Sequence, residues 1–227
     1  MLTVRSLGHA CYMLSAGGFS VILDPFLSGN PDAVCGADEV TVKAVLPSHG
    51  HGDHFGDTIA IAKRLGCPVI ACAELAGYCA RAGCKTVGMH IGGQRGFEFG
   101  TVKLTQAWHG SAMTVGDKVE YVGPAVGFLV TMDGVTVYFA GDTGLFGDMR
   151  LIGDEGVDVA ILPIGDNYTM GPKDALRAVE FLRPKVVIPT HYHAFEAIRQ
   201  DPGAFAAEVE KQGARCVVLG PGEAITA

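Results

Sequence analysis

The chain has 227 residues, of which 48% are hydrophobic and 18% are charged, and its formal net charge at pH 7 is −7. This composition is typical of a folded globular protein and excludes an intrinsically disordered chain. The 17 Lys and Arg residues are scattered and form no basic run, which argues against nucleic acid as a partner.

The length favours a single domain spanning residues 1–227 that can bury a sizeable core. The N-terminal residues lack the apolar core of a signal peptide, and no apolar run approaches the ~20 residues that a bilayer span requires. Seven cysteines cannot all pair within one chain, which favours a reducing compartment. We therefore expect a cytoplasmic protein without a membrane partner.

The first part of the chain predicts strands and then strands alternating with helices. Strands are expected over Leu2–Leu7, Cys11–Leu14, Phe19–Asp24, Val42–Pro47 and Pro68–Ala73, and helices over Asp57–Leu65, with Asp57 as N-cap, and Glu74–Ala82.

The middle of the chain predicts strands over Phe97–Ala107 and Ala125–Ala140, the second broken by a hairpin turn at Asp133-Gly134. The last third alternates again, with strands over Val157–Ile164, Lys185–Pro189 and Arg215–Leu219 and helices over Pro172–Leu182 and Pro202–Lys211. Strands that meander in the middle and alternate with helices at both ends indicate an α/β fold of four layers, two sheets with helices on their outer faces.

A cluster of metal-binding residue types follows the strand predicted over Val42–Pro47. His49, His51, Asp53 and His54 lie within six residues and are separated by Gly50 and Gly52. Imidazole and carboxylate are preferred ligands of zinc and similar metals. Six residues cannot wrap four ligands around one ion without strain, so we expect two neighbouring ions. The glycines are expected to supply the φ/ψ values for a sharp chain reversal.

Further ligand candidates stand just past the ends of other predicted strands. His109 follows Val102–Ala107, Asp142 follows Val135–Ala140, and His191 follows Val186–Pro189. Strand ends at one sheet edge converge on a common point, where α/β proteins place their sites. This shared position favours a ligand role over that of isolated core histidines.

The string HGHGDH, with the later Gly141-Asp142-Thr143-Gly144 and Thr190-His191, resembles the metallo-β-lactamase superfamily. Gly8-His9-Ala10-Cys11, Asp24-Pro25-Phe26 and Pro163-Ile164-Gly165-Asp166-Asn167 are most similar to an uncharacterised family of metal-dependent hydrolases that resembles the ascorbate-phosphate lactonases. The resemblance covers nearly the whole chain and implies an αβ/βα sandwich of two mixed sheets flanked by helices.

The resemblance also implies a ligand set. His49, His51 and His109 would hold one metal ion, Asp53, His54 and His191 the second, and Asp142 would bridge the two. Asp24 resembles the aspartate of the superfamily's first motif and would orient a ligand. Two divalent ions are therefore expected, zinc first and manganese or iron as alternatives.

Such a site predicts hydrolysis by a metal-bridging hydroxide of a small, anionic ester, lactone or phosphodiester, because the metal ions lower the pKa of bound water. Asp142 would position the nucleophile, Asp53 would take part in catalysis, and His9 would act as a substrate contact or proton donor, with a structural hydrogen bond as the alternative. The substrate is expected to be a small molecule, and a homo-oligomer is plausible from the resemblance.

Other functions stay open at this point. The same ligands suit iron, so a redox enzyme of the same fold is the first alternative, and a non-catalytic metal-binding protein is the second. The cytoplasmic expectation argues against a β-lactamase, which needs export. The short, acidic chain argues against the superfamily's nucleases.

Several further residues have two interpretations each. Tyr192 and His193 would face substrate or stay outside the site, Asn167 would line the pocket or form a turn, Thr143 would bind a carboxylate or cap a helix, and Trp108 would pack beneath the site or form a pocket wall. Cys67, Cys72, Cys79 and Cys84 lack the Cys-x-x-Cys spacing of structural zinc sites, so we expect them to pack as small hydrophobic residues.

Overall fold

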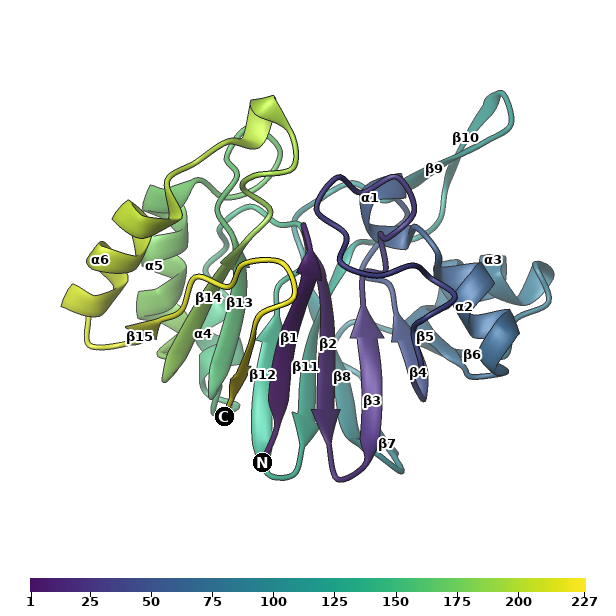
Figure 1. Ribbon diagram of the computed structural model, residues 1–227, viewed down its shortest axis with the longest axis horizontal. Helices are drawn as coiled ribbons and strands as arrows, with labels where there is room; N and C mark the ends of the chain where they lie inside the picture. Colours follow the sequence, from purple (N-terminus) through teal and green to yellow (C-terminus); the bar gives the residue numbers. More distant parts are fainter.

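A computed structural model describes residues 1–227 and places two mixed sheets face to face, with helices on their outer sides (Figure 1). This is the α/β sandwich expected from the sequence. None of the helices has the length and apolar character needed to cross a bilayer.

The first sheet has seven strands in the order β16-β1-β2-β3-β4-β5-β6. Their bounds are Thr3–Gly8 (β1), Cys11–Ala16 (β2), Phe19–Leu23 (β3), Ala44–Leu46 (β4), Val69–Cys72 (β5), Thr86–Met89 (β6) and Ala224–Thr226 (β16). Strands β3 to β6 run parallel, and helices α2 (Thr58–Leu65) and α3 (Ala73–Arg81) pack against β4, β5 and β6. The short helix α1 (Gly52–Phe55) lies at the end of this sheet.

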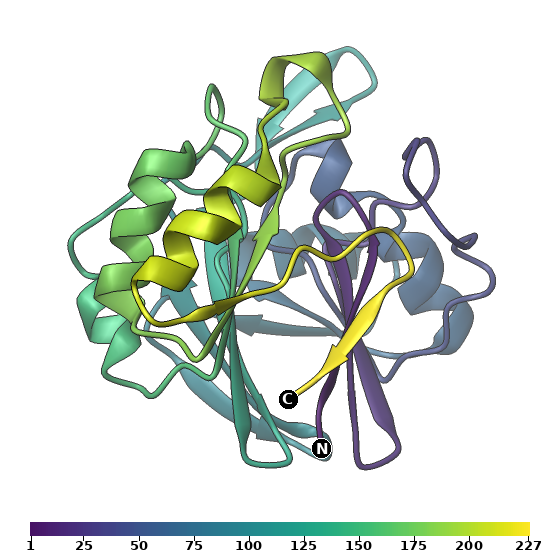
Figure 2. The same cartoon turned by 60° about the vertical axis from the view of Figure 1, so that its left-hand side comes forward.

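The second sheet has seven strands in the order β15-β14-β13-β12-β11-β8-β7. Their bounds are Gln94–Phe97 (β7), Gly100–Gln106 (β8), Val126–Met132 (β11), Val135–Phe139 (β12), Val159–Pro163 (β13), Val186–Thr190 (β14) and Arg215–Cys216 (β15). Helices α4 (Met149–Gly153), α5 (Pro172–Leu182) and α6 (Pro202–Lys211) cover its outer face (Figure 2). A separate hairpin of β9 (Ala112–Val115) and β10 (Lys118–Tyr121) projects from the body (Figure 1), and a short 3₁₀ helix spans Glu196–Ile198.

The main core lies between the two sheets. Tyr12 of β2 and Phe139 of β12 meet there with ring centroids 6.3 Å apart, and both side chains are buried. A second core, which includes Leu162, Phe181 and Phe205, lies between the second sheet and its helices. The C-terminal strand β16 pairs with β1 of the first sheet, so the chain ends lie side by side (Figure 2). The two sheets therefore form one rigid frame for the loops at their edge.

The sequence predicts elements best where local signals mark both their beginning and their end. Helices α5 and α6 have the bounds predicted for them, and each begins with a proline. The turn at Asp133-Gly134 is confirmed, with φ values of 51° and 77° that suit a two-residue hairpin.

Two expectations about these elements are corrected. The strand predicted over Phe97–Ala107 is wrong at its beginning, because Phe97 pairs with Gly100 across a tight turn that ends β7 and begins β8. Asp57 stands at the N-cap position of α2 without capping it. Its carboxylate instead accepts hydrogen bonds from the backbone of Leu27 and Ser28. Helices α1 and α4 and the β9–β10 hairpin, which were not predicted, are short elements without strong periodic signals.

Candidate metal centre

The HGHGDH motif begins three residues after the end of β4 and runs into helix α1. His49 and His54 are buried, whereas His51 and Asp53 are partly exposed. The expected role of the glycines is wrong, because neither Gly50 nor Gly52 has a positive φ. Gly50 is required for a different reason: a Cβ there would lie 2.5 Å from Val122 Cγ2. Close packing explains the first glycine, and open space surrounds the second.

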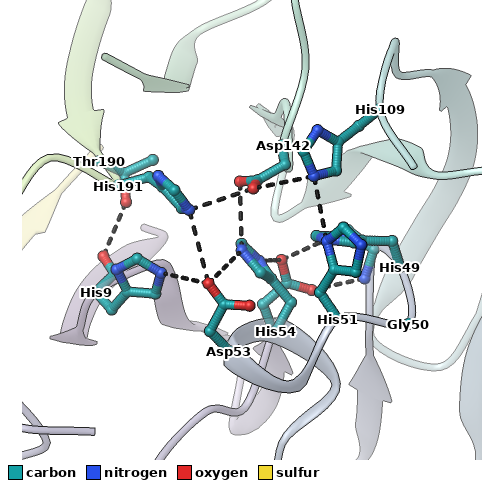
Figure 3. A network of polar contacts seen from close by, with 12 residues as sticks. His9, His49, Gly50, His51, Asp53, His54, His109, Asp142, Thr190 and His191 are labelled. Atoms are coloured by element: carbon teal, nitrogen blue, oxygen red, sulfur yellow. Dashed lines mark hydrogen bonds and ion pairs between the residues drawn. The ribbon is translucent and has the colours of Figure 1, made fainter. Parts of the chain in front are cut away.

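Three histidines point their ring nitrogens toward one another (Figure 3). His49 Nε2 lies 3.0 Å and His109 Nε2 3.2 Å from Nδ1 of His51. Their candidate ligand atoms all lie within 4.8 Å of one another. Three converging imidazole nitrogens at this spacing suit a single transition-metal ion.

A second group lies beside the first and contains Asp53, His54, His191 and His9. Oδ2 of Asp53 is 3.8 Å from His54 Nε2, 3.9 Å from His191 Nε2 and 3.4 Å from His9 Nε2. Three of these four are the ligands expected for the second metal ion. The tertiary structure adds His9 to them.

Asp142 stands between the two groups (Figure 3). Its Oδ2 is 3.5 Å from Nε2 of His109 and 3.2 Å from Nε2 of His191. Its Oδ1 is 3.3 Å from Nε2 of His54. One carboxylate therefore contacts members of both groups, which is the placement that a bridging ligand requires.

Several buried polar atoms of the site have no hydrogen-bond partner. They are Nε2 of His54, Oδ1 of Asp142, Nδ1 of His191 and both ring nitrogens of His9. Buried polar atoms are normally paired, and leaving one unpaired costs about 1–3 kcal/mol. The unpaired atoms are lone-pair donors of the type that coordinate metal ions, so the donor set fits metal binding.

Asp24 and Ser48 orient two of the candidate ligands from behind. Ser48 Oγ donates to Oδ2 of Asp24 at 2.6 Å and therefore accepts Nδ1–H of His49 at 2.9 Å. The same oxygen of Asp24 lies 2.7 Å from Nδ1 of His54. These bonds leave the Nε2 atoms of His49 and His54 facing the site, the arrangement by which carboxylates commonly orient metal-binding histidines.

Two of the buried histidines of the site, His49 and His54, have pKa values shifted in opposite directions. Burial, followed by the neighbouring His54, lowers the pKa of His49 well below its usual value. Burial acts in the same direction on His54, but the carboxylates of Asp142 and Asp24 prevail and raise its pKa. The raised pKa means that His54 retains a second ring proton in the absence of metal. A metal ion between His54 and Asp142 would replace that proton.

The two carboxylates are held in their charged form. Burial of Asp142 opposes ionisation, but His54 and His191 lower its pKa well below the usual range. Burial likewise opposes ionisation of Asp53, but the nearby His9, whose Nε2 lies 3.4 Å away, and the charge of His54 lower its pKa. Both side chains are therefore available as anionic ligands at neutral pH.

His9 lies behind the second group rather than at the surface. Its side chain is fully buried, its ring packs against that of His191 with centroids 4.4 Å apart and an interplanar angle of 46°, and burial lowers its pKa. Its carbonyl oxygen accepts a hydrogen bond from Thr190 at 2.9 Å. The nearest acidic group is Asp53, so the geometry favours contact with that carboxylate over contact with a substrate in solvent.

The residues with two interpretations are placed as follows. Asn167 has a φ of 45° and belongs to a turn closed by the carboxylate of Asp166. His193 is 67% exposed and contacts Asp32, and Trp108 is 65% exposed and does not pack beneath the site. Tyr192 is partly buried against the second core.

Thr143 has a role that neither interpretation described. Its Oγ1 accepts the backbone N–H of Trp108 at 2.9 Å and donates to the carbonyl of Gly144 at 2.7 Å. It thereby ties the loop of Asp142 to the loop of His109.

The site opens into a pocket of about 230 Å³ lined by His51, Asp53, His109, Asp142, His191 and Tyr168. Sequence reasoning missed Tyr168, although it directly follows the singled-out Asp166-Asn167 pair. Nothing in the local sequence indicates that this turn reaches the metal-binding residues, because α5 and β14 separate it from His191.

The cysteines take no part in the site. All seven are free thiols. Cys67, Cys72 and Cys79 are buried in the main core, and Cys84 packs against it. The expectation that these four pack as hydrophobic residues is confirmed.

Comparisons with known proteins agree with the fold and the motif. The family described as "Beta-lactamase superfamily domain" matches residues 3–191. A UPF0173 metal-dependent hydrolase of Pelotomaculum thermopropionicum is 50% identical over 227 residues, covering 99% of both chains. A protein of the same description from Thermus thermophilus is 47% identical over 225 residues, again covering 99% of both.

Among solved structures, Igni18, a metallo hydrolase from the archaeon Ignicoccus hospitalis, is 34% identical with a TM-score of 0.90. The match covers 99% of this chain and 97% of that one.

Proposed function

The chain belongs to the UPF0173 metal-dependent hydrolases of the metallo-β-lactamase superfamily, and from this premise we propose that it hydrolyses a small anionic substrate at a site for two metal ions. The observation that carries the proposal is the position of Asp142, whose carboxylate contacts both groups of candidate ligands. A site for a single ion would not need a carboxylate at that place.

The ligands divide between two positions. His49, His51 and His109 would hold the first ion, Asp53, His54 and His191 the second, and Asp142 both. Zinc is the metal that we propose, because imidazole and carboxylate donors without thiolate suit it in catalytic sites. When bound, two divalent ions supply a water of lowered pKa and polarise the substrate oxygen.

The chain's own side chains would then position the reactants. Asp142 and Asp53 are held ionised, so both would be available as anionic ligands and could accept a hydrogen bond from water in the pocket at a carboxylate oxygen. Asp53 is the more accessible of the two, with a side chain 30% exposed against 4% for Asp142. His9 would orient Asp53 through Nε2.

The substrate class follows from charge and size. A pocket of about 230 Å³ that would also hold the metal ions has room for a small molecule only. The positive charge of the ions favours an anionic substrate, so we propose an ester, lactone or phosphodiester.

A hydrolysis panel tests the proposal. Zinc-loaded protein with measured metal content is assayed against a chromogenic phosphodiester, phosphomonoester, lactone, thioester and β-lactam, beside Asp142→Ala and a remote control, Asp174→Ala, in the exposed first turn of α5. We expect turnover in one class, lost in Asp142→Ala together with part of the bound metal, and unchanged in Asp174→Ala. Full activity of Asp142→Ala with two bound metal ions would refute the bridging role.

A further inference from the structure

The pocket of the metal centre contains one side chain that is not a candidate ligand. Of the six residues that line it, His51, Asp53, His109, Asp142 and His191 belong to the ligand set. Tyr168 is the sixth and the single hydrophobic residue among them. Ligand side chains are committed to metal ions, so only Tyr168 is free to distinguish one substrate from another.

The position of Tyr168 is fixed by a short turn. Asp166 N donates to Met170 O at 3.0 Å, and Thr169 N donates to Asp166 O at 3.0 Å. A further hydrogen bond joins this turn to the residue after Asp142: Met170 N donates to the carbonyl of Thr143 at 2.8 Å. The backbone on either side of Tyr168 is therefore tied to the loop that carries Asp142.

The residues on either side of Tyr168 are of types that suit the backbone conformation of this turn. Asp166 and Asn167 both have left-handed φ values, 58° and 45°, and a Cβ on Gly171 would lie 2.9 Å from Cγ of Asp166. Asp and Asn tolerate this backbone conformation better than other residues with side chains. The local sequence is thus suited to one arrangement of the turn, with Tyr168 at its tip.

The ring of Tyr168 is not used by the fold. It is 59% exposed and belongs to neither hydrophobic core. A large aromatic ring at the mouth of a polar pocket offers an apolar planar face beside a positively charged centre. An anionic group would bind the metal ions, and a flat apolar substituent on it would lie against the ring.

We propose that Tyr168 determines substrate specificity by packing its ring against an aromatic or other planar apolar substituent next to the scissile group. The inference rests on the proposed function, because it takes the metal ions as the site of the anionic group. It names the substrate class more narrowly: an anionic ester or phosphoester that carries a planar apolar substituent.

A binding experiment tests the inference without requiring turnover. Phenylphosphonate and methylphosphonate carry the same metal-binding group and differ in the ring. Their affinities for zinc-loaded protein are measured by calorimetry, supported by fluorescence of the single tryptophan, Trp108, which adjoins His109. We expect phenylphosphonate to bind about tenfold more tightly than methylphosphonate.

Three variants test whether the ring of Tyr168 is the cause of the preference for phenylphosphonate. Tyr168→Phe keeps the ring and should keep the preference, whereas Tyr168→Ala should lose it with methylphosphonate affinity unchanged. Tyr121→Ala is the matched control, because Tyr121 is 72% exposed on β10 and does not line the pocket. It should behave as the unmodified protein does.

The outcomes distinguish the two proposals. Equal affinities for both phosphonates in the unmodified protein, a preference that persists in Tyr168→Ala, or one that disappears in Tyr168→Phe would overturn the role of the ring. If neither phosphonate binds the zinc-loaded protein, the proposed anion-binding metal centre itself fails.

Discussion

Asp24 and His54 form a fully buried pair, with Oδ2 of Asp24 2.7 Å from Nδ1 of His54. The same oxygen accepts a hydrogen bond from the hydroxyl of Ser48, and that hydroxyl in turn accepts a hydrogen bond from His49. One carboxylate from the end of β3 thus orients a candidate ligand of each metal ion.

Asp24→Ala is therefore expected to weaken metal binding at both positions, by about 10–100-fold, since loss of such an orienting partner typically has an effect of this size. Asp24→Asn should lose less metal affinity than Asp24→Ala, because the amide oxygen still accepts one hydrogen bond and Asn tolerates the φ of 43° at this position. A competition titration with a chelating dye measures both affinities. Unchanged affinity in Asp24→Ala would contradict the orienting role.

The two glycines of the motif should differ in their tolerance of alanine. In Gly50→Ala the new Cβ would approach Val122 Cγ2 at 2.5 Å and Met113 Cγ at 2.7 Å, so these side chains must move. We expect a loss of about 1–3 kcal/mol in the free energy of unfolding, with weaker metal binding.

Gly52→Ala is the matched control, because a Cβ there meets nothing within 4 Å and φ is not positive. Its position at the beginning of α1 should make alanine neutral or slightly stabilising. Urea unfolding of the metal-free proteins makes the comparison. Equal losses in the two variants would show that packing at Gly50 is not the constraint.

Thr143 is expected to hold His109 in place through the backbone of Trp108. Thr143→Val keeps the shape of the side chain but removes the acceptor of the Trp108 N–H, and the loss of this hydrogen bond costs about 0.5–1.5 kcal/mol. We expect Thr143→Val to weaken metal binding at the first position, whereas Thr143→Ser retains the hydroxyl and should bind metal as the unmodified protein does. The visible absorption spectrum of the cobalt-substituted protein reports the geometry of the first metal position, and identical spectra for all three proteins would contradict this role.

The buried thiol of Cys79 should make stability fall at alkaline pH. Burial raises its pKa from 9.0 to about 12. A group with a raised folded pKa contributes stability that is fully present below the unfolded pKa and is lost as pH rises through the folded pKa. The free energy of unfolding should therefore decrease between about pH 9 and pH 12.

Cys79→Ala removes this contribution and should flatten that decrease. Denaturant unfolding at pH 8 and at pH 10.5 measures it, with pH 8 as the internal reference, since the thiol is protonated in both states there. A decrease of the same size in the variant would assign the alkaline sensitivity to other groups, such as Tyr138, whose pKa burial also raises.

Much of the fold and of the candidate ligand set could be predicted from sequence alone. The helices Pro172–Leu182 and Pro202–Lys211 are marked by proline at the first position and by hydrophobic spacing, which are properties of neighbouring residues. His49, His51, Asp53 and His54 share one short segment, and His109, Asp142 and His191 each follow a buried strand. The α/β class follows from the same alternation of strands and helices.

Tertiary structure alone decided which distant residues meet. Asp24 reaches His54 because β3 and β4 are neighbours in the first sheet, and Thr143 reaches Trp108 because β12 and β8 end at the same edge of the second sheet. Tyr168 shares a pocket with His51 and Asp53 because the two sheets pack face to face. The tertiary structure also reversed the explanation of Gly50, whose constraint is the approach of Met113 of β9 and of Val122, the residue after β10, from a hairpin that the sequence does not predict. Local periodicity and turn chemistry act over a few residues, whereas these contacts join segments tens of residues apart, and their geometry exists only once the core has formed.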